Sequence, residues 1–472
     1  MNQRTVKVTR MNITRRTFLC ATAATATNAL ARPLQAAMSP PTLTARPGLA
    51  DLGHPSGAKT PIWGYEAAAP GPTLRLKQGT RLIRKFINAL PQPSTVHWHG
   101  IRIANAMDGV PDLTQPLVQP GGDFLYDFTV PDAGTFWYHP HNRTWEQLAR
   151  GLYGALVVEE ADPPAVDRDD VLLIDDWRLD DQGSLNEPTF GAISDWAHGG
   201  RLGNWVTING RADYTATVKH NERLRLRLVN TANARIFTLG VKGLNGWVVA
   251  LDGQPLAAPA PIELITLAPA QRADLIVDVT AETGGEAVLF ATARDRHIVI
   301  GSLKVLNQQR PARLPAPAPL APNPVPGLGD VKSARRVKLH MQGGAMGGMR
   351  RASFEGKQLS MRDLVARGRL WAFNGVTDMP KAPLVDARPG ETIRLAMHND
   401  TAWPHAMHLH GHHFREVKAD DRLGPLRDTL LVARNKTAEI AFLADNPGKW
   451  LFHCHMVEHA ASGMMTWINV AT

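Results

Sequence analysis

Near its C-terminus the chain reads His453-Cys454-His455-Met456-Val457-Glu458-His459, and Met464 follows shortly after. Successive side chains of an extended strand point to opposite faces, so His453 and His455 share one face and Cys454 takes the other. One strand with this sequence therefore predicts two neighbouring metal sites. A thiolate, imidazole and a distant thioether form the ligand set of a copper centre that transfers electrons. Cys454, His459 and Met464 supply this set except for one histidine.

Three further histidine clusters extend the pattern. They contain the pairs His97-Trp98-His99, His139-Pro140-His141 and His408-Leu409-His410. Each His-x-His pair places two imidazoles on one face of a strand. His405 precedes His408 by an odd number of residues and is expected on the opposite face, where it would complete the Cys454 site. Ten of the 18 histidines fall in these clusters and the C-terminal stretch, which argues against a chance arrangement.

At these four motifs the chain resembles the multicopper oxidases, the family of laccases and bacterial cuprous oxidases. The resemblance extends from about residue 42 to the C-terminus. It implies four coppers per chain: one of type 1, one of type 2 and two of type 3. By the family pattern, the type 1 ligands are His405, Cys454, His459 and axial Met464. The type 2 ligands are His97 and His408. One type 3 copper takes His99, His139 and His455, and the other takes His141, His410 and His453. Strand alternation alone predicts only the division into two faces.

An internal repeat predicts where the metal lies. Residues 79–100 are similar to residues 390–411, and both segments end in a His-x-His-Gly motif. A middle copy at 222–240 carries no histidine. The four His-x-His pairs therefore come from the first and third repeats and are expected to meet between the terminal domains. The middle domain is interpreted as a metal-free spacer.

The apolar residues Leu224, Leu226 and Leu228 alternate with polar ones, and turn residues recur about every ten positions. This pattern is typical of short antiparallel strands in β-sandwiches. Together with the resemblance, it predicts an all-β protein with three cupredoxin-like Greek-key β-sandwich domains. The expected boundaries are 42–160, 165–305 and 335–472. The proline-rich residues 306–334 are expected to form an extended linker.

The net charge of +9 does not indicate a nucleic-acid partner. Six basic residues and no acidic ones precede residue 38, and the remainder has 46 basic against 43 acidic residues. Residues 1–37 contain Arg15-Arg16 followed by an Ala/Thr-rich stretch, as in twin-arginine export signals. The stretch is too weakly apolar for a stable membrane span. We therefore predict export by the twin-arginine machinery to the periplasm, with either Met1 or Met11 as the start.

The family resemblance implies that electrons pass from a small-molecule reductant or Cu(I) to dioxygen. Asp108 follows His97 by eleven residues and matches the family's acidic residue near the type 2 copper. It is the candidate proton donor, with a simple Asp-Gly turn as the alternative. Many bacterial relatives carry a second carboxylate directly after the last histidine. This chain has Ala460 there, so the second proton source stays open.

The reducing substrate is less well defined. Met341, Met346 and Met349 lie in a glycine-rich stretch similar to the methionine-rich insert of cuprous oxidases, and thioethers suit Cu(I). A glycine-rich connector is the alternative. Those enzymes carry an acid and a methionine where this chain has Thr401 and Trp403. We therefore predict a laccase-like enzyme that oxidises phenols or aromatic amines. The alternatives are a periplasmic cuprous oxidase and a non-enzymatic exported copper-binding or scaffold protein.

Overall fold

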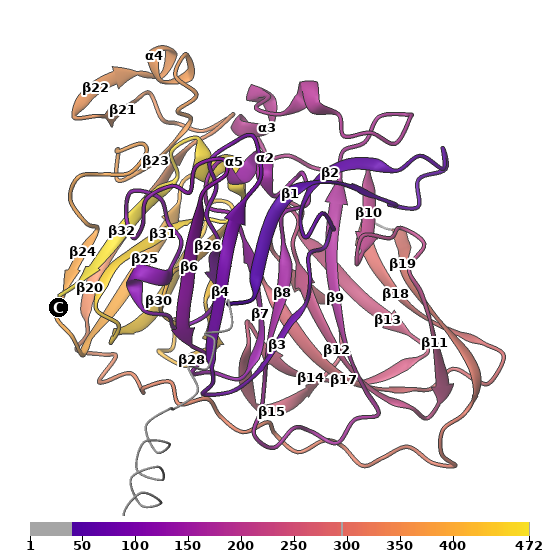
Figure 1. Ribbon diagram of the computed structural model, residues 1–472. Coiled ribbons are helices and arrows are strands. Elements are labelled where there is room, and N and C mark those ends of the chain that lie inside the picture. The colour runs from indigo at the N-terminus through magenta and orange to yellow at the C-terminus, as the bar shows by residue number, and fades with distance from the viewer. Residues whose placement is uncertain (1–39, 294–295, 472) are drawn as a thin grey trace, which may run out of the picture. The chain divides into compact units, whose positions relative to one another are not determined.

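The computed structural model describes residues 40–293 and 296–471. The expected export signal at 1–37 lies outside the described residues. Strands dominate the described part, and they form three successive pairs of sheets (Figure 1). The predicted all-β fold with three cupredoxin-like β-sandwich domains is confirmed. Among the described residues, no helix is long and apolar enough to cross a membrane.

The first pair of sheets is built from residues 42–159. One sheet has the order β2 (Thr60–Tyr65), β1 (Thr42–Ala50), β4 (Arg81–Asn88) and β6 (Asp123–Thr129). The other has the order β3 (Leu74–Lys77), β8 (Gly154–Glu159), β7 (Gly134–His139) and β5 (His97–His99). The two metal-binding motifs expected from this half therefore lie in one sheet, on the neighbouring strands β5 and β7.

The second pair of sheets has its own core, which includes Leu224, Leu239 and Leu289 from both sheets. The first sheet has the order β10 (Trp205–Ile208), β9 (Arg168–Trp177), β12 (Arg223–Asn230), β17 (Arg272–Val279), β14 (Leu244–Leu251) and β15 (Gln254–Pro261). The second has the order β11 (Thr215–His220), β19 (Arg296–Gln308), β18 (Glu286–Ala293), β13 (Phe237–Lys242) and β16 (Ile265–Leu267).

The third pair of sheets is joined to the second by residues 314–330, which contain no helix or strand. One sheet has the order β23 (Trp371–Phe373), β20 (Arg335–Gly343), β25 (Glu391–Asn399), β30 (Thr437–Ala444), β27 (Phe414–Val417) and β28 (Leu423–Arg427). The other has the order β24 (Val385–Ala387), β32 (Met465–Val470), β31 (Gly448–Cys454), β26 (His405–Leu409) and β29 (Thr429–Val432). A hairpin of β21 (Arg351–Phe354) and β22 (Lys357–Ser360) projects from this half.

The threefold repeat is visible in the strand directions. The first strand of each sandwich pairs in parallel with a later one: β1 with β4, β9 with β12 and β20 with β25. A second parallel pair closes each repeat: β3 with β8, β11 with β19 and β24 with β32. The alternation pattern predicted short antiparallel strands, but these six pairs are parallel. Alternation reports which face is buried and is the same for either strand direction.

Helical segments of the described residues are short. They are η1 (Asn105–Met107), α2 (Thr144–Gln147), η2 (Glu187–Thr189), α3 (Ile193–Ala197), α4 (Met361–Val365) and α5 (Val457–Ala461). Of these, α2 and α3 of the first two repeats contact α5 of the third. The largest hydrophobic cluster runs without a break from the first repeat to the third, and it includes Trp98, Phe136, Leu409 and Phe452. The sheets that carry the histidine motifs are thus packed into one shared core.

Candidate metal centres

The side chains of Cys454, His405 and His459 converge at the end of β31. The Cys454 Sγ atom lies 3.5 Å from His405 Nδ1 and 3.7 Å from His459 Nδ1, and these two nitrogens are 3.1 Å apart. All three residues are fully buried. β31 carries the cysteine, β26 begins at His405, and α5 carries His459. The odd spacing from His405 to His408 therefore directs His405 to the thiol, as the sequence predicted.

Hydrogen bonds on the far side of each ring fix which nitrogen faces the thiol. His459 Nε2 donates to the carbonyl of His198 at 2.7 Å. His405 Nε2 lies 2.8 Å from the Thr401 hydroxyl, which itself donates to Asn399 Oδ1 at 2.7 Å. Each imidazole thus carries its proton on Nε2 and presents a bare Nδ1 inward. Two lone pairs 3.1 Å apart repel each other, so this geometry suits a cation bound between the two nitrogens.

A proton is a poor candidate for that cation. Burial lowers the pKa of His459 to about 4, and burial together with His459 lowers the pKa of His405 well below its usual value. Burial also raises the pKa of the Cys454 thiol to about 12. A bound metal ion stabilises the thiolate and uses the neutral imidazoles directly. The residues therefore fit copper, for which thiolate with imidazole is a suitable ligand set.

Met464 follows Cys454 by ten residues, at the position that the family pattern gives to the axial ligand. It is fully buried in the same hydrophobic cluster as Cys454. Its carbonyl accepts a hydrogen bond from the Cys454 backbone amide at 3.2 Å. The axial role of its thioether stays a prediction.

Thr401, which stands where cuprous oxidases carry an acid, orients the imidazole of His405. We expect Thr401→Val to weaken copper binding at the Cys454 site by roughly 10–100-fold, because the ring loses the acceptor that fixes its tautomer. Copper titration followed by visible absorption measures this change. Thr437→Val is a matched control, since Thr437 contacts the imidazole of His398 at the surface. Equal copper affinity in Thr401→Val and wild type would contradict the role.

The His-x-His pairs meet across the two sheets that carry them. Strand pairing places His97 opposite His139 in the first repeat and His408 opposite His453 in the third. Across the interface, the rings of His97 and His410 stack with their centroids 4.0 Å apart. The rings of His99 and His408 stack in the same way, with centroids 3.8 Å apart. The four pairs form one cluster, as the repeat predicted.

Several imidazole nitrogens of this cluster are buried without a hydrogen-bond partner among the residues that the structure describes. They are His97 Nε2, His99 Nδ1, His141 Nε2, His408 Nε2 and His455 Nδ1. In addition, His410 Nε2 and His453 Nε2 face each other at 3.1 Å. Their opposite nitrogens donate to the Asp108 carboxylate and to the Cys454 carbonyl, each at 2.9 Å. Unpaired buried polar atoms are costly, so these nitrogens are suited to ligate metal.

Burial favours the neutral form, the state that binds metal, in seven of the eight rings. Burial lowers the pKa values of His141 and His408 to about 3. It also lowers the pKa values of five further cluster members well below their usual value; these are His99, His139, His410, His453 and His455. Potential ligand atoms of His141, His410 and His453 lie within 4.8 Å of one another, and so do those of His97, His99 and His139. His97 also groups with His408 and His410, so distances alone do not divide the cluster among three metals.

Asp108 lies at the cluster, as the sequence predicted. Its backbone carbonyl accepts from His97 Nδ1 at 2.7 Å, and its Oδ2 accepts from His410 Nδ1 at 2.9 Å. Its Oδ1 lies 3.3 Å from His97 Nδ1 and makes no other polar contact among the described residues.

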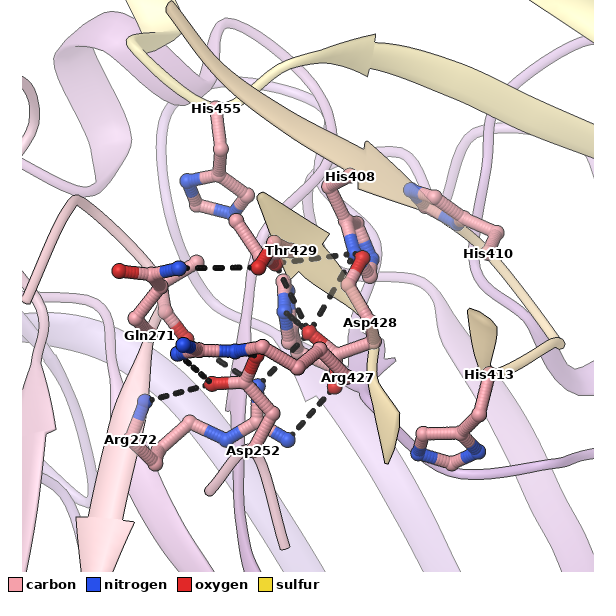
Figure 2. Close-up of polar contacts among 12 residues, drawn as sticks. Asp252, Gln271, Arg272, His408, His410, His413, Arg427, Asp428, Thr429 and His455 are labelled. Atoms are coloured by element: carbon pink, nitrogen blue, oxygen red, sulfur yellow. Dashed lines mark hydrogen bonds and ion pairs between the residues drawn. The ribbon is translucent and has the colours of Figure 1, made fainter. Parts of the chain in front are cut away.

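A second aspartate, Asp428, escaped the sequence reasoning. Its carbonyl accepts from His408 Nδ1 at 2.8 Å (Figure 2). Its Oδ1 lies 3.2 Å from His99 Nε2. The ion pair with Arg272 lowers the pKa of Asp428 to about 2 despite complete burial. Asp428 has no fixed sequence spacing from a histidine motif that could predict its role. It reaches the cluster through the pairing of β29 with β26.

The position after the last histidine carries no carboxylate, since Ala460 occupies it. The carboxyl group of α5 belongs instead to Glu458, which is buried and accepts from Asn233 Nδ2 at 2.7 Å. Burial raises the pKa of Glu458 to about 7.

The three methionines of the glycine-rich stretch do not gather at one surface. Met341 is completely buried in the main core. Met349 is 9% exposed and packs in a small separate cluster with Ala352 and Leu364. Met346 alone is open to solvent, with 77% of its surface exposed.

Comparisons with known proteins agree with this ligand chemistry. Three family profiles described as multicopper oxidase match residues 51–163, 168–301 and 353–472. The multicopper oxidase MmcO of Mycobacterium tuberculosis is 30% identical, and the match covers 93% of this chain and 88% of the relative. Copper resistance protein A of Escherichia coli is 26% identical, and the match covers 85% of this chain and 88% of the relative.

Solved structures with a similar fold include multicopper oxidases. A multi-copper oxidase from Pseudomonas thermotolerans has a TM-score of 0.79 and 34% identity over 92% of this chain and 99% of its own. Lac15 from a marine microbial metagenome has a TM-score of 0.73 and 40% identity over 92% of this chain and 100% of its own. Family profiles over three successive segments and relatives along nearly the whole length leave one conclusion. The chain belongs to the multicopper oxidase family, whose members are copper-containing oxidoreductases that use oxygen.

Proposed function

We propose that this protein is a laccase-like oxidase that removes single electrons from phenols or aromatic amines and reduces dioxygen to water. The observation that carries the proposal is the strand β31, which presents Cys454 to one site and His453 to the other. Copper bound at these sites would supply one-electron oxidation at the cysteine and four-electron reduction of dioxygen at the histidine cluster.

The proposed ligands are those of the family pattern, four coppers in all. A type 1 copper would be held by His405, Cys454, His459 and Met464, and a type 2 copper by His97 and His408. The type 3 pair would be held by His99, His139 and His455 and by His141, His410 and His453. The unpaired imidazole nitrogens and the bare Nδ1 atoms around Cys454 support this assignment.

The chain links the two sites by a short path. Cys454 is bonded directly to His453 and His455, and His453 Nδ1 also donates a hydrogen bond to the Cys454 carbonyl at 2.9 Å. A covalent strand reinforced by a hydrogen bond holds the two sites at a fixed separation. Electrons taken at the thiol side therefore reach the histidine side without a movement of the chain.

Asp108 is proposed to deliver protons at the histidine cluster. Its Oδ2 is engaged by His410, while Oδ1 is buried beside His97 with no further partner among the described residues. A carboxyl oxygen that is free of other bonds can hold a proton within reach of the reacting oxygen.

The surroundings of His459 support an aromatic reductant. His459 is fully buried, and its Nε2 is bonded to the carbonyl of His198 on the segment after α3. The exposed His198 ring lies edge to face with Trp403, with ring centroids 5.5 Å apart. Trp371 packs on His459 with ring centroids 4.3 Å apart. A reductant would therefore meet an aromatic surface at His198 and Trp403, where a flat ring can stack.

Oxidation of Cu(I) is the second candidate. The loop that holds Met346 is bonded to α3, because the Ala345 amide donates to the carbonyl of Ala197 at 2.6 Å. Met346 is thus an exposed thioether on the loop that contacts Trp403, because Trp403 Nε1 donates to the Ala345 carbonyl at 3.3 Å. Similar proteins include copper resistance proteins and a multicopper oxidase from Campylobacter jejuni described as a metallo-oxidase. With Met341 and Met349 buried, a single exposed thioether supports this activity less well than the aromatic surface supports the first.

Oxygen uptake by the copper-loaded protein, with Cu(I), a diphenol and an aromatic amine as alternative donors, tests the proposal. We expect the organic donors to be turned over faster, and Met346→Leu to affect only the Cu(I) rate. Val365→Leu is a control for a change at an exposed apolar side chain. Cu(I) oxidation that exceeds the organic rates and collapses in Met346→Leu would establish the second candidate instead.

We also infer that the protein is exported to the periplasm by the twin-arginine route. This inference is supported by Arg15-Arg16 and the Ala/Thr-rich stretch that follows them.

A further inference from the structure

Asp108 and Asp428 hold the central histidines in a crossed arrangement. Asp108, from the first repeat, accepts from its own His97 through its backbone carbonyl and from His410 of the third repeat through its carboxylate. Both contacts leave the Nε2 atom of the ring free to face the cluster. One aspartate thus orients a proposed type 2 ligand and a proposed type 3 ligand from different repeats.

Asp428, from the third repeat, mirrors this arrangement. Its carbonyl accepts from its own His408, and its carboxylate accepts from His99 of the first repeat. The contact with His99 Nε2 leaves Nδ1 of that ring bare, and Nδ1 is the nitrogen that lacks a partner among the described residues. The two aspartates are therefore equivalent in their contacts with the histidines.

The two aspartates differ in the other partners of their carboxylates. Arg272, at the start of β17 in the middle repeat, binds Asp428 through both terminal nitrogens, at 2.9 and 2.7 Å (Figure 2). In the described part of the chain, Asp108 forms ion-pair contacts with histidines alone. Asp108 thus has one carboxylate oxygen without a hydrogen-bond partner among the described residues, whereas both carboxylate oxygens of Asp428 accept hydrogen bonds from Arg272.

Arg272 is itself held rigidly. It is fully buried, and its Nε donates to the carbonyl of Thr135 in the first repeat at 3.1 Å. Its guanidinium lies 3.8 Å from Asp252, which forms an ion pair with Arg427 at 2.8 Å. Asp428, Arg272, Asp252 and Arg427 thus form a row of alternating negative and positive side chains, so their charges are balanced. Such a network is costly to bury, and breaking one pair leaves an uncompensated charge.

The first histidine motif leaves space for this ion pair. Gly100 follows His99 directly and has a φ of +87°. A Cβ atom at this position would overlap the Arg272 guanidinium and lie 2.6 Å from Asp428 Oδ2. The glycine therefore lets an arginine from another repeat approach the histidine strand.

We propose that Arg272 is a positioning residue, which clamps Asp428 so that His99 and His408 present their bare nitrogens to the copper cluster. The proposal rests on the ligand assignment given above. It also changes the interpretation of the middle repeat, which was expected to be only a spacer. Its described residues include none of the proposed copper ligands, but they supply the cation that fixes the ligands of the neighbouring repeats.

Replacement of Arg272 by lysine and by glutamine tests the proposal. Lysine keeps the charge but cannot form the paired hydrogen bonds, and glutamine removes the charge. In both variants we expect copper affinity of the histidine cluster to fall by roughly 10–100-fold, while the blue absorption of the Cys454 site is retained. Asp428→Asn is expected to have the same effect. Arg225→Lys is the matched control, since Arg225 is an equally buried arginine of the middle repeat paired with Glu160 and Asp274.

A second readout needs no copper. In the metal-free protein, nitrogen NMR of the histidines reports which ring nitrogen carries the proton. We expect His99 and His408 to show one tautomer each in wild type and in Arg225→Lys, and mixed tautomers in Arg272→Lys. If Arg272→Gln does not fold, the lysine variant decides the question. Single tautomers and undiminished copper affinity in Arg272→Lys would overturn the proposal. Failure of wild type to bind copper would refute the proposed function instead, and the tautomers would still test Arg272.

Discussion

Replacement of Cys454 by serine is expected to abolish the intense blue absorption of the copper-loaded protein, together with oxidation of organic donors. The colour arises from charge transfer between a thiolate and copper, and Cys454 is the one cysteine among the described residues. Its Sγ lies within 3.7 Å of both His405 Nδ1 and His459 Nδ1, and a serine oxygen is a harder ligand that does not replace it. Visible absorption and metal analysis measure the effect, and the variant should hold one copper fewer per chain.

The histidine cluster provides the internal control for this variant. His453 and His455 point to the other face of β31, so the cluster should keep its copper and its type 2 paramagnetic signal. Loss of all copper would instead show that the two sites do not form independently. A blue Cys454→Ser protein would contradict the assignment of the thiolate ligand.

Replacement of Asp108 by asparagine should slow reoxidation of the reduced enzyme by dioxygen, while reduction by a phenol proceeds at the wild-type rate. The reason is the location of Asp108 at the histidine cluster, where its carboxyl group is bonded to His410 and lies beside His97. Loss of a general acid or base costs typically roughly 10²–10⁴-fold in rate. Rapid-mixing measurements of the two half-reactions separate the effects.

Asp112→Asn is the matched control, because Asp112 belongs to the same loop and its backbone amide bonds to Gln115 within that loop. It should leave both half-reactions unchanged. The alternative for Asp108 is a turn residue, since it follows η1 and precedes Gly109, which has a φ of +85°. Unchanged reoxidation in Asp108→Asn would favour this structural role.

The sequence predicted the parts of the site that depend on strand periodicity. His453 and Cys454 diverge, and His405 and His408 diverge, because alternation is a local property of an extended chain. The motif spacing and the repeat also predicted which histidines converge, and the structure brings them together. The family resemblance assigned individual histidines to individual metals, which the geometry does not separate.

The supporting residues could not be predicted because they depend on contacts between distant parts of the chain. Asp428 reaches His99 across 329 residues, and Arg272 reaches Asp428 across 156. Thr401 lies near His405 in sequence, but its role follows from the direction of one hydroxyl. The parallel strand pairs were missed for a similar reason, since alternation does not report strand direction. The middle repeat was interpreted from its missing histidines, and nothing in that pattern indicated Arg272.

We propose that one chain holds a thiolate copper centre and a separate cluster of three coppers, joined by β31. Electron paramagnetic resonance of the fully copper-loaded wild-type protein, combined with metal analysis, tests it most directly. We expect four coppers per chain, of which one gives a type 1 signal, one gives a type 2 signal and a coupled pair is silent. A colourless protein, or one whose copper is entirely paramagnetic, would contradict it.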